Sequence, residues 1–258
     1  MSISSMTDNG SSSRRPTIGR AMGVTAALLA AALMASCAAS SPVSEKRTVE
    51  DRAGSSQSST VTPSTPQVSL RGEHRLGKTD ARIGIVEFSD YECPYCSGFY
   101  TQIFPQLKKK YVDTGIAQFI SKDLPLTRIH RQALSAALAA NCAGDQGQYW
   151  EMHGALYTNQ EHLGPALYFH LARDLGIDEG KYFACLEDPA QERKILRDMA
   201  EAQRLGISST PSFVLGIIEN DTMRVMRVAR GSPGFEAFAQ EIGNLQKQIN
   251  KDAASPAK

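Results

Sequence analysis

The chain has 258 residues, which is long enough for one large domain or two small ones. A hydrophobic content of 41% and a charged content of 21% are ordinary for globular proteins and exclude a wholly disordered chain. A net charge of +1 provides no large positive field to hold a polyanion, so we expect no nucleic acid partner.

Residues 1–36 have the pattern of a signal peptide. Arg14, Arg15 and Arg20 form a positive n-region, and the mostly apolar residues 21–36 are too short to span a bilayer but suit an h-region. Small residues directly precede Cys37, and this segment resembles the lipobox of bacterial lipoproteins, in which the cysteine is lipidated. The alternative is an ordinary cleaved signal, for which the same small residues supply the cleavage site.

Residues 37–66 are expected to be the lipidated cysteine followed by a flexible tether. Ser, Thr and Pro dominate this stretch, and it contains no aromatic residue. Such a composition cannot bury enough apolar surface to offset the entropy lost on ordering. A tether after a lipid anchor would let a membrane-held domain reach soluble partners.

The folded domain is predicted over residues 67–250, with a disordered tail at 251–258. Four short apolar or alternating runs are predicted strands: residues 82–88, 116–120, 212–215 and 223–228. Three segments have a helical pattern: residues 94–110, most of 128–205, and 235 to about 248. Pro105 is expected to kink the first of these helices. The order of elements predicts an α/β sheet with a helical insertion.

The segment Cys93-Pro94-Tyr95-Cys96 lies where a predicted strand turns into a predicted helix. At a helix N-terminus, free N–H groups and the helix dipole favour the thiolate form of Cys93. Cys96 follows about one turn later, where it points inward and can close a small disulfide with Cys93. Stabilising the thiolate stabilises the reduced pair, which makes the disulfide a stronger oxidant.

Two metal-binding alternatives compete with redox chemistry. A single C-x-x-C can be half of a zinc site, but Cys142 and Cys185 are isolated and no closely spaced histidine pair accompanies them. Copper(I) favours sulfur ligands, which Met223 or Met226 could add in a non-catalytic copper-binding or chaperone-like module. The five histidines are expected to be surface or packing residues.

Residues 79–96, TDARIGIVEFSDYECPYC, resemble the active-site segment of DsbA-like thiol oxidoreductases of the thioredoxin superfamily. Three further segments resemble that family: residues 122–126, 139–153 and 206–216. The resemblance covers about residues 68–250. It implies a thioredoxin fold with a helical insertion at about 128–205, a redox-active disulfide in place of any cofactor, and a cis Thr210-Pro211 peptide packed against that disulfide.

The resemblance also implies roles for three further residues. An acidic residue at the position of Glu87 lies near the buried cysteine and can take the Cys96 proton during exchange, with Lys122 as a candidate partner. The alternative places Glu87 in solvent at a sheet edge. Cys142 and Cys185 are expected to form a second disulfide, as in some members of the family, rather than remain two buried free thiols. Five cysteines then divide into one lipid site, two redox residues and two structural residues.

The function implied is a thiol-disulfide oxidoreductase of the bacterial cell envelope or periplasm. It would introduce disulfides into exported proteins and be reset by a separate redox partner. A disulfide reductase or isomerase for a dedicated envelope client is the alternative, because the sequence does not determine the direction of exchange. We expect a monomer, since the place of the dimerisation domain found in dimeric periplasmic isomerases holds only the tether.

Overall fold

The computed structural model describes residues 65–254. The predicted signal peptide, Cys37 and nearly all of the tether lie outside these residues. Within them, no helix is long and apolar enough to cross a membrane.

The centre of the fold is a six-stranded mixed sheet in the order β1-β6-β5-β3-β4-β2. Its strands are β1 (Gln67–Ser69), β2 (His74–Leu76), β3 (Ile83–Ser89), β4 (Ala117–Asp123), β5 (Ser212–Glu219) and β6 (Thr222–Arg230). Strands β3 and β4 are parallel, and the other neighbours are antiparallel. All seven residues of β3 are buried, which explains its nearly continuous apolar sequence. The four predicted strands are confirmed, whereas the short edge strands β1 and β2 were not predicted.

Helices cover both faces of the sheet. One face packs against α1 (Pro94–Gln102), α2 (Phe104–Leu107), the π-helical turn Lys108–Val112 and α8 (Phe235–Ala254). The predicted kink is confirmed, because the helix breaks at Ile103 and resumes with Pro105 in its first turn. The last helix runs on to Ala254. The prediction that the tail starts at residue 251 was therefore wrong for residues 251–254, which extend the same helix.

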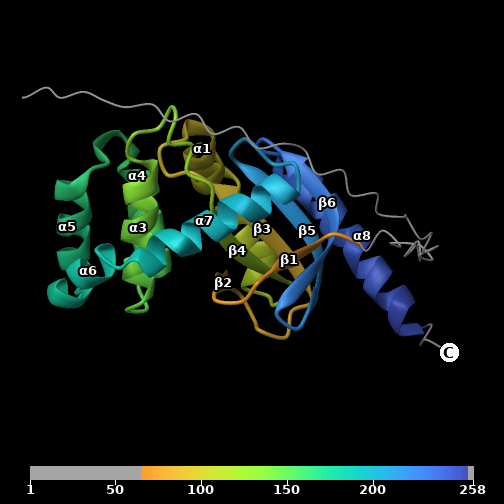
Figure 1. The fold of residues 1–258 in the computed structure, drawn as a ribbon. Helices are drawn as coiled ribbons and strands as arrows, with labels where there is room; N and C mark the ends of the chain where they lie inside the picture. The colour runs from red at the N-terminus through yellow and green to blue at the C-terminus, as the bar shows by residue number, and fades with distance from the viewer. Residues whose placement is uncertain (1–64, 255–258) are drawn as a thin grey trace, which may run out of the picture. The chain divides into compact units, whose positions relative to one another are not determined.

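The helical insertion is confirmed between β4 and β5. It comprises α3 (Ala133–Gly144), α4 (Tyr149–Thr158), the 3-10 turn η2 (Gln160–His162), α5 (Pro165–Asp174), α6 (Glu179–Leu186) and α7 (Pro189–Arg204). Helices α3–α6 lie to one side of the sheet, and α7 runs from them across the second face of the sheet (Figure 1). Six buried alanines in α3 allow its neighbours to approach closely. The core of the insertion continues into the C-x-x-C segment, because Cys93 and Cys96 pack in the same apolar cluster.

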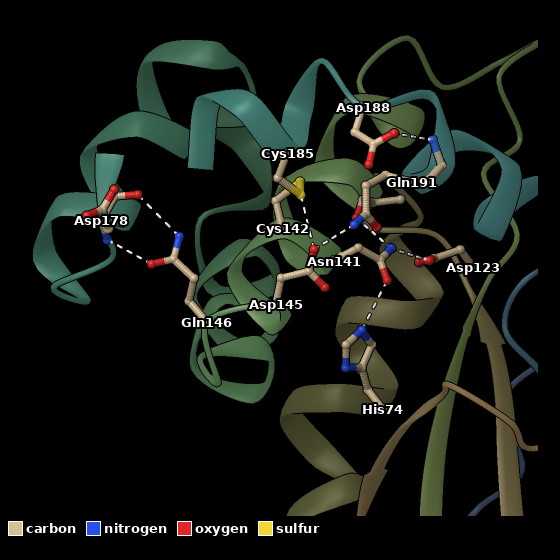
Figure 2. The surroundings of a disulfide bond; sticks show 12 residues. His74, Asp123, Asn141, Cys142, Asp145, Gln146, Asp178, Cys185, Asp188 and Gln191 are labelled. Carbon is tan, nitrogen blue, oxygen red and sulfur yellow. Dashed lines mark hydrogen bonds between the residues drawn. A yellow bond between two sulfur atoms is a disulfide. The ribbon is translucent and has the colours of Figure 1, made fainter. Parts of the chain in front are cut away.

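Cys142 and Cys185 form a disulfide, with an S–S distance of 2.01 Å. The alternative of two free thiols was therefore wrong. The bond joins α3 to α6, and hydrogen bonds flank it: Gln191 donates to Asp145 at 2.6 Å, and Gln146 pairs with the Asp178 backbone (Figure 2).

Removing this disulfide should destabilise the protein without touching the redox cysteines. The bond closes a loop of 43 residues, so Cys142→Ala with Cys185→Ala should lower the free energy of unfolding by about 2–4 kcal/mol. Denaturant unfolding of the double variant and the parent measures the loss. Non-reducing peptide mapping should link the two cysteines, and alkylation of both in untreated protein would contradict the pairing.

Candidate active site

Cys93 stands at the N-terminus of α1, directly after the central strand. It is the N-cap residue, with φ −77° and ψ 119°, and Pro94 follows in the first turn, where the missing N–H of proline costs nothing. The Cys93 N–H donates to the Asp90 carbonyl at 3.1 Å. Cys96 lies one turn further and is fully buried, and both thiols are free. The strand-to-helix junction predicted from the sequence is confirmed.

The Thr210-Pro211 peptide is cis and lies against Cys93. The Cys93 sulfur is 3.4 Å from the Thr210 carbonyl oxygen. Strand pairing explains the contact, because Ser212 at the start of β5 pairs with Phe88 near the end of β3. Two segments 117 residues apart therefore meet at the same edge of the sheet, as the sequence prediction required.

The pKa values of the two thiols are shifted in opposite directions. The pKa of Cys93 falls from 9.0 to about 5, chiefly because the Cys96 thiol donates a hydrogen bond to the Cys93 sulfur. Hydrogen bonds from Thr210 and from the N–H groups of Tyr95 and Cys96 lower this pKa further, whereas burial raises it. The pKa of Cys96 is raised, mainly by burial and then by its bond to Cys93 and the charge of Glu87. These shifts favour ionisation of Cys93 near neutral pH and retention of the proton by Cys96.

Glu87 is buried in the central strand, with 1% of its surface exposed. The alternative of a solvent-facing residue at a sheet edge was wrong, because β3 has a strand on either side. Burial raises the pKa of Glu87 well above its ordinary value, and the negative charge of Cys93 raises it further. The Glu87 pKa responds to the charge of Cys93, and the Cys96 pKa responds to the charge of Glu87, so this carboxyl group is suited to exchange a proton with Cys96.

Lys122 does not pair with Glu87, contrary to the candidate pairing. The parallel register places Glu87 opposite Ser121, so Lys122 points to the other face of the sheet. There its Nζ contacts Glu73 at 2.6 Å, Asp198 at 2.8 Å and Glu201 at 3.0 Å. Lys122 therefore links α7 to the sheet, and among residues 65–254 no lysine pairs with the carboxyl group of Glu87.

The helical insertion and the loop that precedes it contact residues 90–93 in ways that the sequence did not predict. The buried Asp90 carboxylate accepts hydrogen bonds from the N–H groups of Glu92 and Leu126, both at 2.8 Å, and from His130 Nδ1 at 2.7 Å. The Gln160 side chain donates to the Tyr91 and Cys93 carbonyls. These are single polar residues in loops and turns, so no local pattern marked them. Only their long-range contacts connect them with the C-x-x-C segment.

The other candidate ligands are not brought to Cys93. A Cβ at Gly84, near the start of β3, would lie 2.4 Å from the Met223 sulfur, whereas Cys93 follows the opposite end of that strand. Met226 is 40% exposed on β6. Over residues 65–254, no three His, Cys, Asp or Glu side chains gather in a group that could hold a metal ion. His153 is fully buried and donates to or accepts from Tyr91 Oη at 2.8 Å, which agrees with its predicted packing role.

The fold and the site define a thiol-disulfide oxidoreductase of the thioredoxin fold. They combine a mixed sheet with a C-x-x-C at a helix N-terminus and a facing cis-proline. The family model described as Thioredoxin matches residues 69–223. The chain therefore belongs to the thioredoxin family. Within it the chain is DsbA-like: α-DsbA1 of Wolbachia pipientis aligns over 95% of its own chain and 70% of this one, with a TM-score of 0.62 and 25% identity.

Two curated relatives extend the comparison. Disulfide bond formation protein D of Bacillus subtilis is 28% identical over 162 residues, which cover 60% of this chain and 73% of that protein. The Na(+)/H(+) antiporter NhaA 3 of Salinispora tropica is 35% identical over 141 residues, which cover 55% of this chain. That match spans only 21% of the antiporter. The similarity to the antiporter is therefore confined to about a fifth of its length.

The free energy of unfolding of the reduced protein should increase as the pH rises from 5 to 8. Folding lowers the Cys93 pKa to about 5, so the thiolate contribution is complete above the unfolded pKa and is lost as pH falls through the folded pKa. At pH 7 it amounts to about 3 kcal/mol, at 1.36 kcal/mol per pH unit. Unfolding of reduced and oxidised protein across this range measures it, because the disulfide form has no thiolate. A pH-independent difference between the two forms would contradict the lowered pKa.

Proposed function

We propose that this chain is a protein thiol-disulfide oxidoreductase that introduces disulfides into exported proteins through Cys93 and Cys96. The observation that carries the proposal is the asymmetry of the two thiols. The Cys93 sulfur lies 3.4 Å from the Thr210 carbonyl oxygen of the cis-proline loop and its pKa is lowered to about 5, whereas the pKa of the Cys96 thiol is raised. A stabilised thiolate favours the reduced pair, and a pair that readily becomes reduced is an oxidant of other thiols.

The exchange proceeds in two balanced steps. A substrate thiolate attacks the Cys93 sulfur of the disulfide, a mixed disulfide forms, and the Cys93–Cys96 bond breaks. Cys96 leaves as a thiolate and takes the proton of Glu87. A second substrate thiolate then attacks the substrate sulfur of the mixed disulfide, which releases Cys93 as a thiolate. The substrate has lost two electrons, and the C-x-x-C pair has gained them without a further cofactor.

The reduction potential of the Cys93–Cys96 pair tests this direction. An oxidase requires a potential well above that of thioredoxin, about −270 mV, and nearer to that of DsbA, about −120 mV. Equilibration with glutathione buffers, followed by quantification of both redox forms, measures it. A potential close to thioredoxin's would favour the alternative, a reductase or isomerase for a dedicated client. The Cys93 pKa of about 5 supports the oxidising direction.

We further propose that the substrates are exported proteins with free thiols, that a separate redox partner reoxidises the C-x-x-C pair, and that the protein acts as a monomer in the cell envelope. Cys37 carries the proposed lipid anchor, because small residues directly precede it after the apolar segment. Mass spectrometry of the mature N-terminus should find an acylated Cys37. A start at Ala38 or later without an acyl mass would contradict the anchor and leave the redox proposal intact.

A further inference from the structure

Gln160 lies beside the redox cysteines although 67 residues separate it from Cys93. It is the first residue of η2, in the insertion. Its Nε2 donates to the Tyr91 carbonyl at 2.7 Å and to the Cys93 carbonyl at 2.9 Å. A primary amide has two N–H hydrogens, and both are used here. Gln160 therefore holds the backbone on both sides of Glu92.

The Cys93 carbonyl oxygen accepts three hydrogen bonds. Besides Gln160, the N–H groups of Cys96 and Ser97 approach its oxygen at 3.1 Å and 3.2 Å. The next residue is Pro94, which has no N–H, so the Cys93-Pro94 peptide can be anchored only through this carbonyl. The first turn of α1 holds the oxygen from one direction, and the insertion holds it from another. Displacement of the Cys93 backbone would change the position of its sulfur relative to Thr210.

We propose that Gln160 is a positioning residue of the redox pair: from the insertion, its side-chain amide fixes the Cys93 backbone so that the sulfur stays aligned between the Cys96 thiol and the cis-proline loop. This proposal extends the proposed function, and only its statement about disulfide exchange rests on that function. The insertion thereby acts on the reactivity of the nucleophile, in addition to covering the C-x-x-C segment. Gln160 does not touch the reacting sulfur and acts through the backbone of Cys93.

The surroundings of Gln160 make its substitution feasible. The residue is half-buried and lines a polar hollow of about 340 Å³ with residues that include Ser97, Asn159 and His162. Water can therefore solvate the two carbonyls when the amide is absent. We expect the substitution to leave the fold intact and to loosen the Cys93 backbone.

The test compares Gln160→Leu and Gln160→Glu with the full-length parent. The rate of Cys93 alkylation by iodoacetamide is followed against pH in the reduced proteins, and exchange with glutathione is followed at pH 7. Gln160→Leu should raise the midpoint of the alkylation profile and slow exchange about tenfold, as loss of two ordinary hydrogen bonds allows. Gln160→Glu should have a larger effect at pH 7, because its carboxylate faces two carbonyl oxygens.

Asn159→Leu is the matched control. Asn159 is the adjacent amide, and its Nδ2 donates to Ala155 at 2.8 Å and to Thr158 without touching residues 90–93. Asn159→Leu should keep the parent's midpoint of Cys93 alkylation against pH, whatever its effect on the free energy of unfolding. An unchanged midpoint and rate in both Gln160 variants, or an equal shift in Asn159→Leu, would overturn the proposal. Alkylation reports on Cys93 even if the parent fails to oxidise substrates, so failure of the proposed function is a separate result.

Discussion

Cys93→Ser should reduce disulfide exchange to the background rate, whereas Cys96→Ser should trap substrates as mixed disulfides. Cys93 carries the sulfur that faces the cis-proline loop, and Cys96 is fully buried behind it. With a pKa of about 5, Cys93 is almost entirely a thiolate at pH 7. Without the Cys96 thiol, Cys93 cannot leave the mixed disulfide by forming the Cys93–Cys96 bond. Non-reducing electrophoresis with a disulfide-bonded substrate separates the two outcomes, because the Cys93 thiolate of Cys96→Ser attacks one sulfur of the substrate disulfide and the other sulfur leaves as a thiolate.

A second pair of variants tests why Cys93 is acidic. The largest cause of its low pKa is the hydrogen bond from the Cys96 thiol. Cys96→Ser retains a hydroxyl donor at this position, and Cys96→Ala does not. Ultraviolet titration of the thiolate should therefore give a higher Cys93 midpoint in Cys96→Ala than in Cys96→Ser. Equal midpoints near the free-thiol value of about 8.5 would contradict both the hydrogen bond and the helix-terminus argument.

Lys122→Met should cost about 3–5 kcal/mol of stability, although Lys122 is on the sheet face opposite the redox pair. Its Nζ is buried among Glu73, Asp198 and Glu201 at 2.6–3.0 Å. Removing the cation leaves Lys194 as the remaining lysine beside Glu73 and Asp198, and the loss of a buried ion pair is far more costly than the loss of an exposed one. Urea unfolding at pH 7 measures the difference from the parent.

Lys108→Met is the matched control for Lys122→Met. Lys108 also contacts one carboxylate at 2.6 Å, that of Asp113, but both side chains are more than 40% exposed. Its loss should cost at most about 1 kcal/mol. The penalty of Lys122→Met should shrink as pH falls below 7, because burial and the charge of Asp198 raise the pKa of Glu73, and a protonated Glu73 no longer needs a cation. Equal losses in the two variants would show that the buried ion pairs contribute no more than exposed ones.

Much of the fold could be predicted from local patterns. The apolar run that became β3, the helical pattern after Cys93 and the proline break at residue 105 each depend on residues close together in the chain. The C-x-x-C at the strand-to-helix junction was predicted for the same reason. The cis-proline and the Cys142–Cys185 bond came from resemblance to a family, since no local rule pairs cysteines 43 residues apart.

The sequence by itself therefore determined the four longer strands, the helical segments between them and the C-x-x-C at a helix N-terminus, because these follow from short-range periodicity and from residues close together in the chain. The tertiary structure alone decided the partners of the buried polar groups. Glu87 is buried because β4 and β5 flank its strand, and Lys122 turned to the other face because one step along a strand reverses the side chain. Gln160 reached Cys93 only through the packing of the insertion. Such contacts depend on register and on how distant helices pack, which no short stretch of sequence encodes.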